Sequence, residues 1–175
     1  CHILLMTLMI FPVLTPTAEA RTYDSLQLAL ESPETAKALK LNGTLIEGIE
    51  RIAELKDLEV LQLRNCGLKA LPENLSSLKK LRLLILSGNQ LKSLPEGLGQ
   101  LQSLEYIYLE NNRFEKLPAG ISELPSLKAI YLSGNQIADV PEALAGMPSL
   151  QLVTLGGNPI AKDRVLRNRT NRILA

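Results

Sequence analysis

A repeat of constant length constrains this chain more than any other feature of its sequence. Leucines open successive copies of one pattern every 23 residues, with no insertion or deletion between them: Leu58, Leu81, Leu104, Leu127 and Leu150. A fixed period of this length is the signature of a solenoid, in which each copy packs against its neighbours. We therefore expect one elongated domain, and we number the positions of each copy from 1, starting at these leucines.

Apolar residues recur at positions 4, 6 and 11 of each copy, as in Leu84, Leu86 and Leu91. Positions 4 and 6 lie two residues apart, so in an extended chain they share one face, while positions 3, 5 and 7 share the other. The sequence therefore predicts a short strand in every copy. Positions 4 and 6 are expected in the core, and positions 3, 5 and 7 are expected to face solvent.

Position 9 indicates how the chain turns after each strand. It is a cysteine in the first copy and an asparagine in the others: Cys66, Asn89, Asn112, Asn135 and Asn158. A turn inside the coil leaves backbone donors and acceptors there, and a buried asparagine amide can satisfy both kinds. We expect these five residues to form a structural ladder, with Cys66 as a small buried residue in place of an asparagine. A reactive thiol at Cys66 is the alternative.

The second half of each copy carries a Leu-Pro or Val-Pro pair at positions 14 and 15, for example Leu94-Pro95. Proline has a fixed φ and no N–H to donate, so this pair favours an extended, polyproline-like segment over a long helix. Together, these positions match the signature L-x-x-L-x-L-x-x-[NC]-x-L, and from about residue 36 to 160 the chain resembles the leucine-rich repeat family. The 23-residue form with Leu-Pro is similar to repeats of bacterial secreted or surface proteins and of intracellular Ras-group proteins.

The resemblance implies an α/β repeat solenoid. The family forms a horseshoe with a parallel, concave β-sheet and a convex side of 3-10 or polyproline-like segments, and helical caps are expected at both ends. Residues 21–35 predict the N-terminal helical cap, with Asp24 or Ser25 capping the helix. Residues 36–57 predict a degenerate first repeat with Thr44 at the ladder position, and residues 58–160 predict the regular repeats.

The two ends of the chain depart from the repeat. Residues 1–20 combine an apolar run with small residues at the −3 and −1 positions of a cleavage site, which predicts a signal peptide removed near Ala20. A retained anchor and a soluble N-terminal extension are the alternatives. We expect the basic start of that signal to be missing. Residues 161–175 carry five basic side chains among apolar ones and predict a basic C-terminal cap or tail. A polyanion-binding patch is the alternative for this segment.

Residues that could support catalysis or hold a metal are scarce. His2 is the only histidine and lies in the predicted signal peptide, so the mature chain offers none for a catalytic triad or a metal site. Gly156-Gly157 fits the repeat turn better than a phosphate-binding loop. The formal net charge of +1 argues against nucleic acid as a partner. We predict a monomer that is not an enzyme, with no cofactor, no metal and no stable membrane span.

The concave face is the surface that the repeat leaves free to vary. Contiguous apolar and aromatic residues on such a face mark interaction sites, and tyrosine is enriched among binding anchors. The candidate ligand-binding residues at positions 3 and 5 are Leu83, Ile85, Tyr106, Tyr108, Tyr131 and Leu152. Arg64 and Glu110, at position 7, are expected to form a polar rim. The β-propensity of exposed strands would favour the same apolar residues without any function.

The sequence therefore predicts a non-enzymatic module that binds a protein ligand through its concave sheet, and that is secreted, periplasmic or displayed on the cell surface. One alternative is an intracellular, cytoplasmic scaffold like the Ras-group proteins. Another is the recognition part of a larger receptor or effector whose catalytic domain is absent from this sequence.

Overall fold

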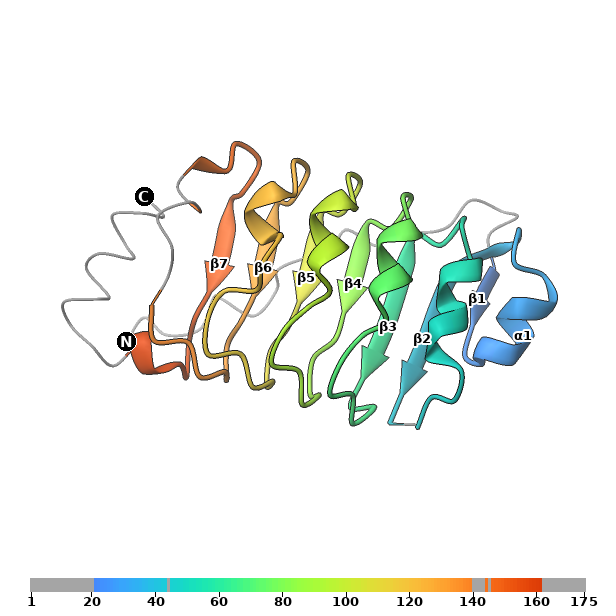
Figure 1. Ribbon diagram of the computed structural model, residues 1–175, viewed down its shortest axis with the longest axis horizontal. Coiled ribbons are helices and arrows are strands. Elements are labelled where there is room, and N and C mark those ends of the chain that lie inside the picture. The colour runs from blue at the N-terminus through green and yellow to red at the C-terminus, as the bar shows by residue number, and fades with distance from the viewer. Residues whose placement is uncertain (1–20, 44, 140–143, 145, 162–175) are drawn as a thin grey trace, which may run out of the picture.

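Seven parallel strands form one open sheet in the order of the sequence (Figure 1). The computed structural model of the 175-residue chain describes residues 21–43, 45–139, 144 and 146–161. The strands are β1 (Arg21–Tyr23), β2 (Ala36–Asn42), β3 (Val60–Arg64), β4 (Leu83–Ile85), β5 (Tyr106–Tyr108), β6 (Ala129–Tyr131) and β7 (Leu152–Thr154). This sheet confirms the predicted leucine-rich repeat solenoid.

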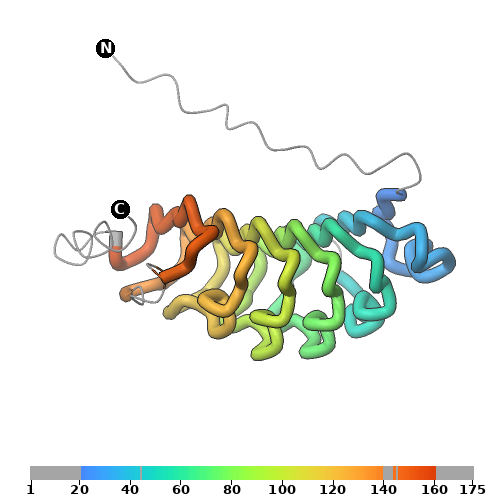
Figure 2. The backbone as a smooth tube through the Cα atoms, turned by 90° about the horizontal axis from the view of Figure 1, so that it is seen from above, coloured from blue at the N-terminus to red at the C-terminus, as the bar shows by residue number. Residues whose placement is uncertain are grey.

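Short 3-10 segments carry the chain back along the other side of the coil. They are η1 (Ile49–Glu54), η2 (Glu73–Ser77), η3 (Glu96–Gln100), η4 (Ile121–Glu123) and η6 (Pro159–Ala161). Seen from above, the strands line one side of the solenoid and these segments line the other (Figure 2). The convex side is therefore built of 3-10 turns, as the family resemblance implies, where the Leu-Pro pairs alone favoured an extended segment.

The ends of the solenoid differ in what the structure describes. Helix α1 (Leu26–Glu31) begins after Ser25, whose side chain accepts a hydrogen bond from the backbone N–H of Leu28 at 3.5 Å. Leu26 and Ala29 of this helix belong to the hydrophobic core. The predicted signal peptide, Thr44 and all but the first residue of the predicted C-terminal cap lie outside the described residues.

The core lies between the strands and the 3-10 segments. Leucines and isoleucines at positions 4 and 6 are fully buried in successive copies, including Leu84, Leu86, Ile107 and Leu109. Equivalent positions of neighbouring strands pair directly, so that Leu84 lies beside Ile107 and Ile107 beside Ile130. The 23-residue period thus becomes rows of like side chains that run the length of the solenoid.

The position-9 asparagines hold the turns together. The Oδ1 atom of Asn112 accepts a hydrogen bond from the backbone N–H of Leu91 at 3.1 Å. Its Nδ2 atom donates to the carbonyl oxygens of Leu86 at 3.0 Å and Leu109 at 3.1 Å. Asn89, Asn135 and Asn158 make equivalent contacts between adjacent copies. Each amide therefore satisfies backbone groups that the turn leaves inside the coil.

Candidate functional site

Two columns of apolar side chains run across the concave sheet. At position 3, Leu83, Tyr106, Ala129 and Leu152 pair in turn across β4, β5, β6 and β7. At position 5, Ile85, Tyr108, Tyr131 and Thr154 do the same. Adjacent strands lie about 4.8 Å apart, so side chains of one column are in contact. We use the name concave patch for Leu83, Ile85, Tyr106, Tyr108, Tyr131 and Leu152.

Two tyrosines form the rigid centre of the concave patch. The rings of Tyr108 and Tyr131 stack with their centroids 4.2 Å apart and their planes 8° apart. Burial is the main cause that raises the pKa of Tyr108 well above its ordinary value, and hydrogen bonding to Tyr131 raises it further. The Tyr108 hydroxyl therefore stays protonated and neutral at physiological pH. Aromatic pairs of this kind give interfaces rigid contact area at low entropic cost.

Exposure within the concave patch differs from the expectation that positions 3 and 5 face solvent. Ile85 is only 7% exposed and Tyr108 only 8% exposed, so the prediction that both face solvent is wrong. The reason is the close spacing of the strands, because the side chains on either side lie against these two and cover them. Leu83, Tyr106, Tyr131 and Leu152 remain partly exposed. They are the members of the concave patch that a ligand can touch.

A polar rim follows the concave patch at the carboxyl ends of the strands, and most of its members pair with a neighbouring repeat. The Ser87 hydroxyl donates to Glu110 Oε2 at 2.8 Å, and the Ser133 hydroxyl donates to Thr154 Oγ1 at 3.2 Å. Arg64, at the end of β3, is partly buried, and its Nε atom is buried without a hydrogen-bond partner among the described residues. The structure thus places both predicted rim residues, Arg64 and Glu110, beside the concave patch.

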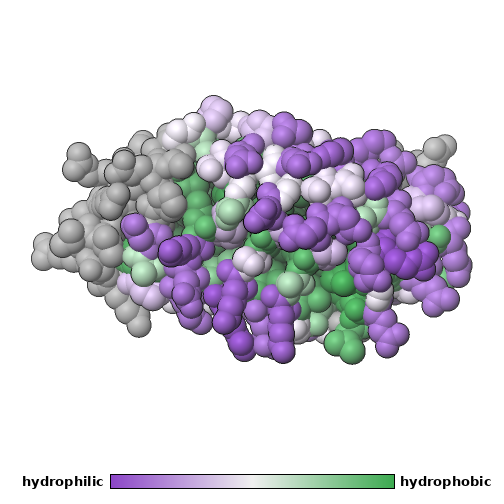
Figure 3. Space-filling view, viewed as in Figure 1, coloured by the Kyte–Doolittle hydropathy of each residue, from purple (hydrophilic) through white to green (hydrophobic). Residues whose placement is uncertain are grey.

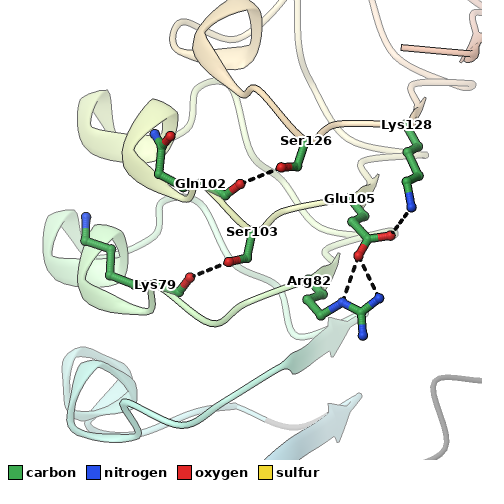
Figure 4. A network of polar contacts seen from close by, with 7 residues as sticks. All are labelled: Lys79, Arg82, Gln102, Ser103, Glu105, Ser126 and Lys128. Carbon is green, nitrogen blue, oxygen red and sulfur yellow. Dashed lines mark hydrogen bonds and ion pairs between the residues drawn. The ribbon is translucent and has the colours of Figure 1, made fainter. Parts of the chain in front are cut away.

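A second polar surface, which the sequence did not lead us to expect, lies at the amino ends of the strands (Figure 4). Glu105 sits between two cations, with Arg82 Nη2 at 2.7 Å and Lys128 Nζ at 2.6 Å from its carboxylate oxygens. Burial opposes ionisation of Glu105, but hydrogen bonds from Lys128 and Arg82 outweigh it and lower its pKa below the ordinary value. The Glu105 carboxylate therefore ties three successive repeats together.

Serines at position 23 make a parallel set of contacts beside that carboxylate. The hydroxyls of Ser103, Ser126 and Ser149 donate to backbone carbonyl oxygens of the preceding repeat at 2.8, 2.7 and 2.8 Å. With the charged residues they line an open groove of about 430 Å³. The recurrence of serine in three consecutive copies was the signal in the sequence. Since each of these hydroxyls is used to join two repeats, we assign the groove a structural role.

Three further features of the described residues concern metal binding, membrane spanning and the Cys66 thiol. Within the described ranges, no group of three or more histidine, cysteine or acidic side chains is placed to hold a metal ion. No helix in the same ranges has the length and apolar character needed to cross a bilayer. The buried Cys66 thiol donates to the carbonyl oxygens of Arg64 at 3.3 Å and Leu41 at 3.4 Å. Those contacts are what its ladder position requires.

Comparisons with known proteins agree with this architecture. The family model described as Leucine rich repeat matches residues 56–114 and 102–160. A leucine-rich repeat protein of Leptospira interrogans superposes with a TM-score of 0.68 at 27% sequence identity, covering 79% of this chain and 41% of that one.

A second solved structure is the leucine-rich repeat ectodomain of the plant membrane receptor kinase GASSHO1/SCHENGEN3 from Arabidopsis thaliana, in complex with CASPARIAN STRIP INTEGRITY FACTOR 2. Its TM-score is 0.61 at 28% identity, and the match covers 74% of this chain and 16% of that one. The chain thus spans less than half the length of either structure. No curated protein matches the sequence.

Proposed function

Because this chain belongs to the leucine-rich repeat family, whose fold is a general protein-interaction module, we propose that it binds a segment of a protein ligand on its concave sheet. In this proposal the chain is not an enzyme. It offers a preformed surface and needs no cofactor or metal to do so. A preformed surface loses little conformational entropy when it binds.

One observation carries the proposal: partly exposed leucines and tyrosines adjoin one another on the concave patch. Contiguous apolar surface on a soluble protein marks an interaction site more often than scattered apolar residues do. The large exposed hydrophobic side chains elsewhere in the described ranges, Leu28 and Leu45, lie apart from it on α1 and after β2. On the side seen in Figure 3, where the 3-10 segments lie in front of the strands, hydrophilic side chains predominate. The ligand is therefore assigned to the opposite face.

The architecture of a similar structure supports a protein or peptide as the partner. The Arabidopsis receptor kinase ectodomain was solved in complex with CASPARIAN STRIP INTEGRITY FACTOR 2. Since this chain shares that fold at 28% identity, a partner of the same general class is the natural candidate. The match does not extend to the identity of the partner, because it covers only 16% of the receptor chain.

The test of the concave patch is capture of a partner by variants that leave the core intact. Leu83→Ser combined with Tyr106→Ser alters two partly exposed members of the concave patch. Lys92→Ser combined with Glu115→Ser alters two exposed residues outside it and serves as the control. We expect the parent protein and the control variant to capture a partner from extract that the patch variant does not capture. All three proteins should melt as cooperative units. Equal capture by all three would remove the concave patch from consideration.

We further propose that the chain is exported, on the strength of the signal-like sequence of residues 1–20. Arg21 is the first residue of β1, so a mature chain that begins there retains the whole sheet. N-terminal sequencing of the expressed protein tests this step. A start at Arg21 supports export, whereas a start before Arg21 would show that residues 1–20 are not removed there. The position of the next in-frame stop codon tests the third possibility, that the chain is the recognition part of a larger receptor or effector.

A further inference from the structure

Arg64 stands out among the polar side chains that border the concave patch. On its own strand, Gln62 donates to Asn42 Oδ1 of β2 at 2.8 Å, and the next two repeats are joined by the Ser87–Glu110 hydrogen bond. The Nε atom of Arg64, by contrast, is buried and has no hydrogen-bond acceptor within the described part of the chain. A buried N–H group without a partner is rare in folded proteins because it has lost its water and gained nothing.

The surroundings of Arg64 explain why no acceptor within the described ranges is available to it. Two of the other arginines there pair with carboxylates on the same element or the next repeat, Arg51 with Glu54 and Arg82 with Glu105. Arg64 forms no such ion pair in the described ranges. Glu110, the acidic residue of the rim, lies two strands away and accepts the Ser87 hydroxyl. The guanidinium therefore keeps an unused positive charge at the edge of an apolar surface.

The position of Arg64 joins that charge to the concave patch. Its strand pairs with β4 so that Gln62, two residues earlier on the same face, lies beside Ile85. Ile85 in turn lies beside Tyr108, the buried half of the tyrosine stack. The charge of Arg64 also acts to lower the pKa of Tyr108, so the two side chains lie near each other. A ligand bound over the tyrosine stack therefore lies close to the Arg64 side chain, which as a whole is only partly buried.

We propose that Arg64 binds a carboxylate group of the protein ligand, presented next to apolar side chains that contact the concave patch. This inference rests on the proposed function and adds the chemistry of the partner to it. A guanidinium presents its N–H groups as planar forks that match the two oxygens of a carboxylate, and the two Nη groups at the tip of the side chain form one such fork. A doubly charged anion is a poorer fit, because Glu110 adds negative charge to the same rim.

The test uses three short peptides titrated into the isotopically labelled full chain and followed by nuclear magnetic resonance. Acetyl-Leu-Phe carries a chain-terminal carboxylate, acetyl-Leu-Phe-Asp-amide carries a side-chain carboxylate, and acetyl-Leu-Phe-amide carries neither. Loss of one resonance in Arg64→Gln assigns the Nε–H signal of Arg64. Arg82→Gln, at the groove by the amino ends of the strands, is the matched control, because Arg64 lies at the carboxyl end of β3.

We expect at least one acidic peptide to shift the Arg64 Nε–H signal and the Tyr131 ring signals, and to bind about tenfold more tightly than the neutral amide. Binding of acetyl-Leu-Phe would identify a chain-terminal carboxylate as the ligand group, and binding of acetyl-Leu-Phe-Asp-amide would identify a side-chain carboxylate. The tighter binding of the acidic peptide should disappear in Arg64→Gln and persist in Arg82→Gln. It should return in part in Arg64→Lys, because lysine restores the positive charge but not the planar fork.

Two results would overturn the inference. Equal shifts of the Tyr131 signals by all three peptides, with the Arg64 signal unmoved, would leave the concave patch as a binding surface and exclude Arg64 as a carboxylate site. No shift of the concave patch by any peptide would count against both the carboxylate site and the apolar recognition on which it rests. A backbone spectrum of Arg64→Gln that matches the parent rules out misfolding as the cause of lost binding.

Discussion

Single residues in this fold act through the repeats on either side of them. The amide of Asn112 contacts backbone atoms of its own copy and of the preceding one. A side chain that appears once per copy therefore stabilises two turns at a time.

The substitution Asn112→Ala tests that role. It leaves the backbone N–H of Leu91 and the carbonyl oxygen of Leu86 without this partner inside the coil. We expect the free energy of unfolding in urea to fall by about 1–3 kcal/mol. The control Gln90→Ala, at a partly exposed neighbouring position, should change it by less than about 0.5 kcal/mol. Equal losses in the two variants would contradict the ladder.

Position 8 shows a second dependence between copies. Asn65 and Asn111 alternate there with Gly88 and Gly134, and all four have positive φ. A Cβ atom added to Gly88 would collide with Oδ1 of Asn65, and one added to Gly134 would collide with Oδ1 of Asn111. Each glycine is thus required both by its own conformation and by the asparagine of the copy before it.

The substitution Gly88→Ala should therefore be more damaging than its backbone conformation alone explains. The left-handed conformation costs a non-glycine residue about 1–2 kcal/mol, and the collision with Asn65 adds to it. The double variant Asn65→Gly, Gly88→Ala removes the collision. Its loss of unfolding free energy should therefore fall to the cost of the left-handed backbone conformation alone. Urea unfolding of the two single variants and the double variant measures this coupling. Simple additivity would mean that the two side chains do not compete for one space.

At the scale of elements, the amino ends of β4, β5 and β6 are joined by one carboxylate. The pKa of Glu105 is lower in the folded chain than its ordinary value of 4.5. The stabilisation that ionised Glu105 provides is therefore fully present above that value, and is lost as the pH falls through the folded pKa.

We expect Glu105→Gln to make the stability of the protein less sensitive to acid. The parent should lose stability faster than the variant as the pH falls from roughly 5 to roughly 3, because only the parent has this carboxylate to protonate. Thermal melting across that range measures the difference. Glu96→Gln, at an exposed carboxylate at the start of η3, is the control and should follow the parent. Parallel pH profiles for the parent and Glu105→Gln would show that the bridge to Arg82 and Lys128 contributes nothing.

The sequence was sufficient to predict the strands of the repeats, because positions 4 and 6 alternate with positions 3 and 5 in each copy. It did not predict β1, which lies before the repeats in a segment that was expected to be a helical cap. Burial of Leu84 and Leu86 follows from that alternation alone. The burial of Ile85 and Tyr108 does not, because it depends on which side chains stand beside them on the neighbouring strands. The bridge of Glu105 was missed for a similar reason: its partners lie one period away on each side, and a pattern read within one copy does not reveal them.

At the scale of the whole molecule, the two sides of the solenoid have different tasks. The 3-10 segments and the ladder maintain the spacing of the repeats, and the sheet presents the concave patch at that spacing. Parallel strands that pair in strict register place Leu83, Tyr106 and Leu152 on one surface although they are separated by whole copies in the sequence. A ligand that follows this surface contacts several repeats at once.

Hydroxyl-radical footprinting of the tyrosines, with and without a captured partner, tests the assignment of the concave patch most directly. Tyr106 and Tyr131 are partly exposed on the concave patch, and Tyr23 is partly exposed on β1, away from it. We expect a saturating partner to reduce the oxidation of Tyr106 and Tyr131 while that of Tyr23 stays the same. Unchanged oxidation of Tyr106 and Tyr131 in the saturated complex would contradict the assignment of binding to the concave sheet.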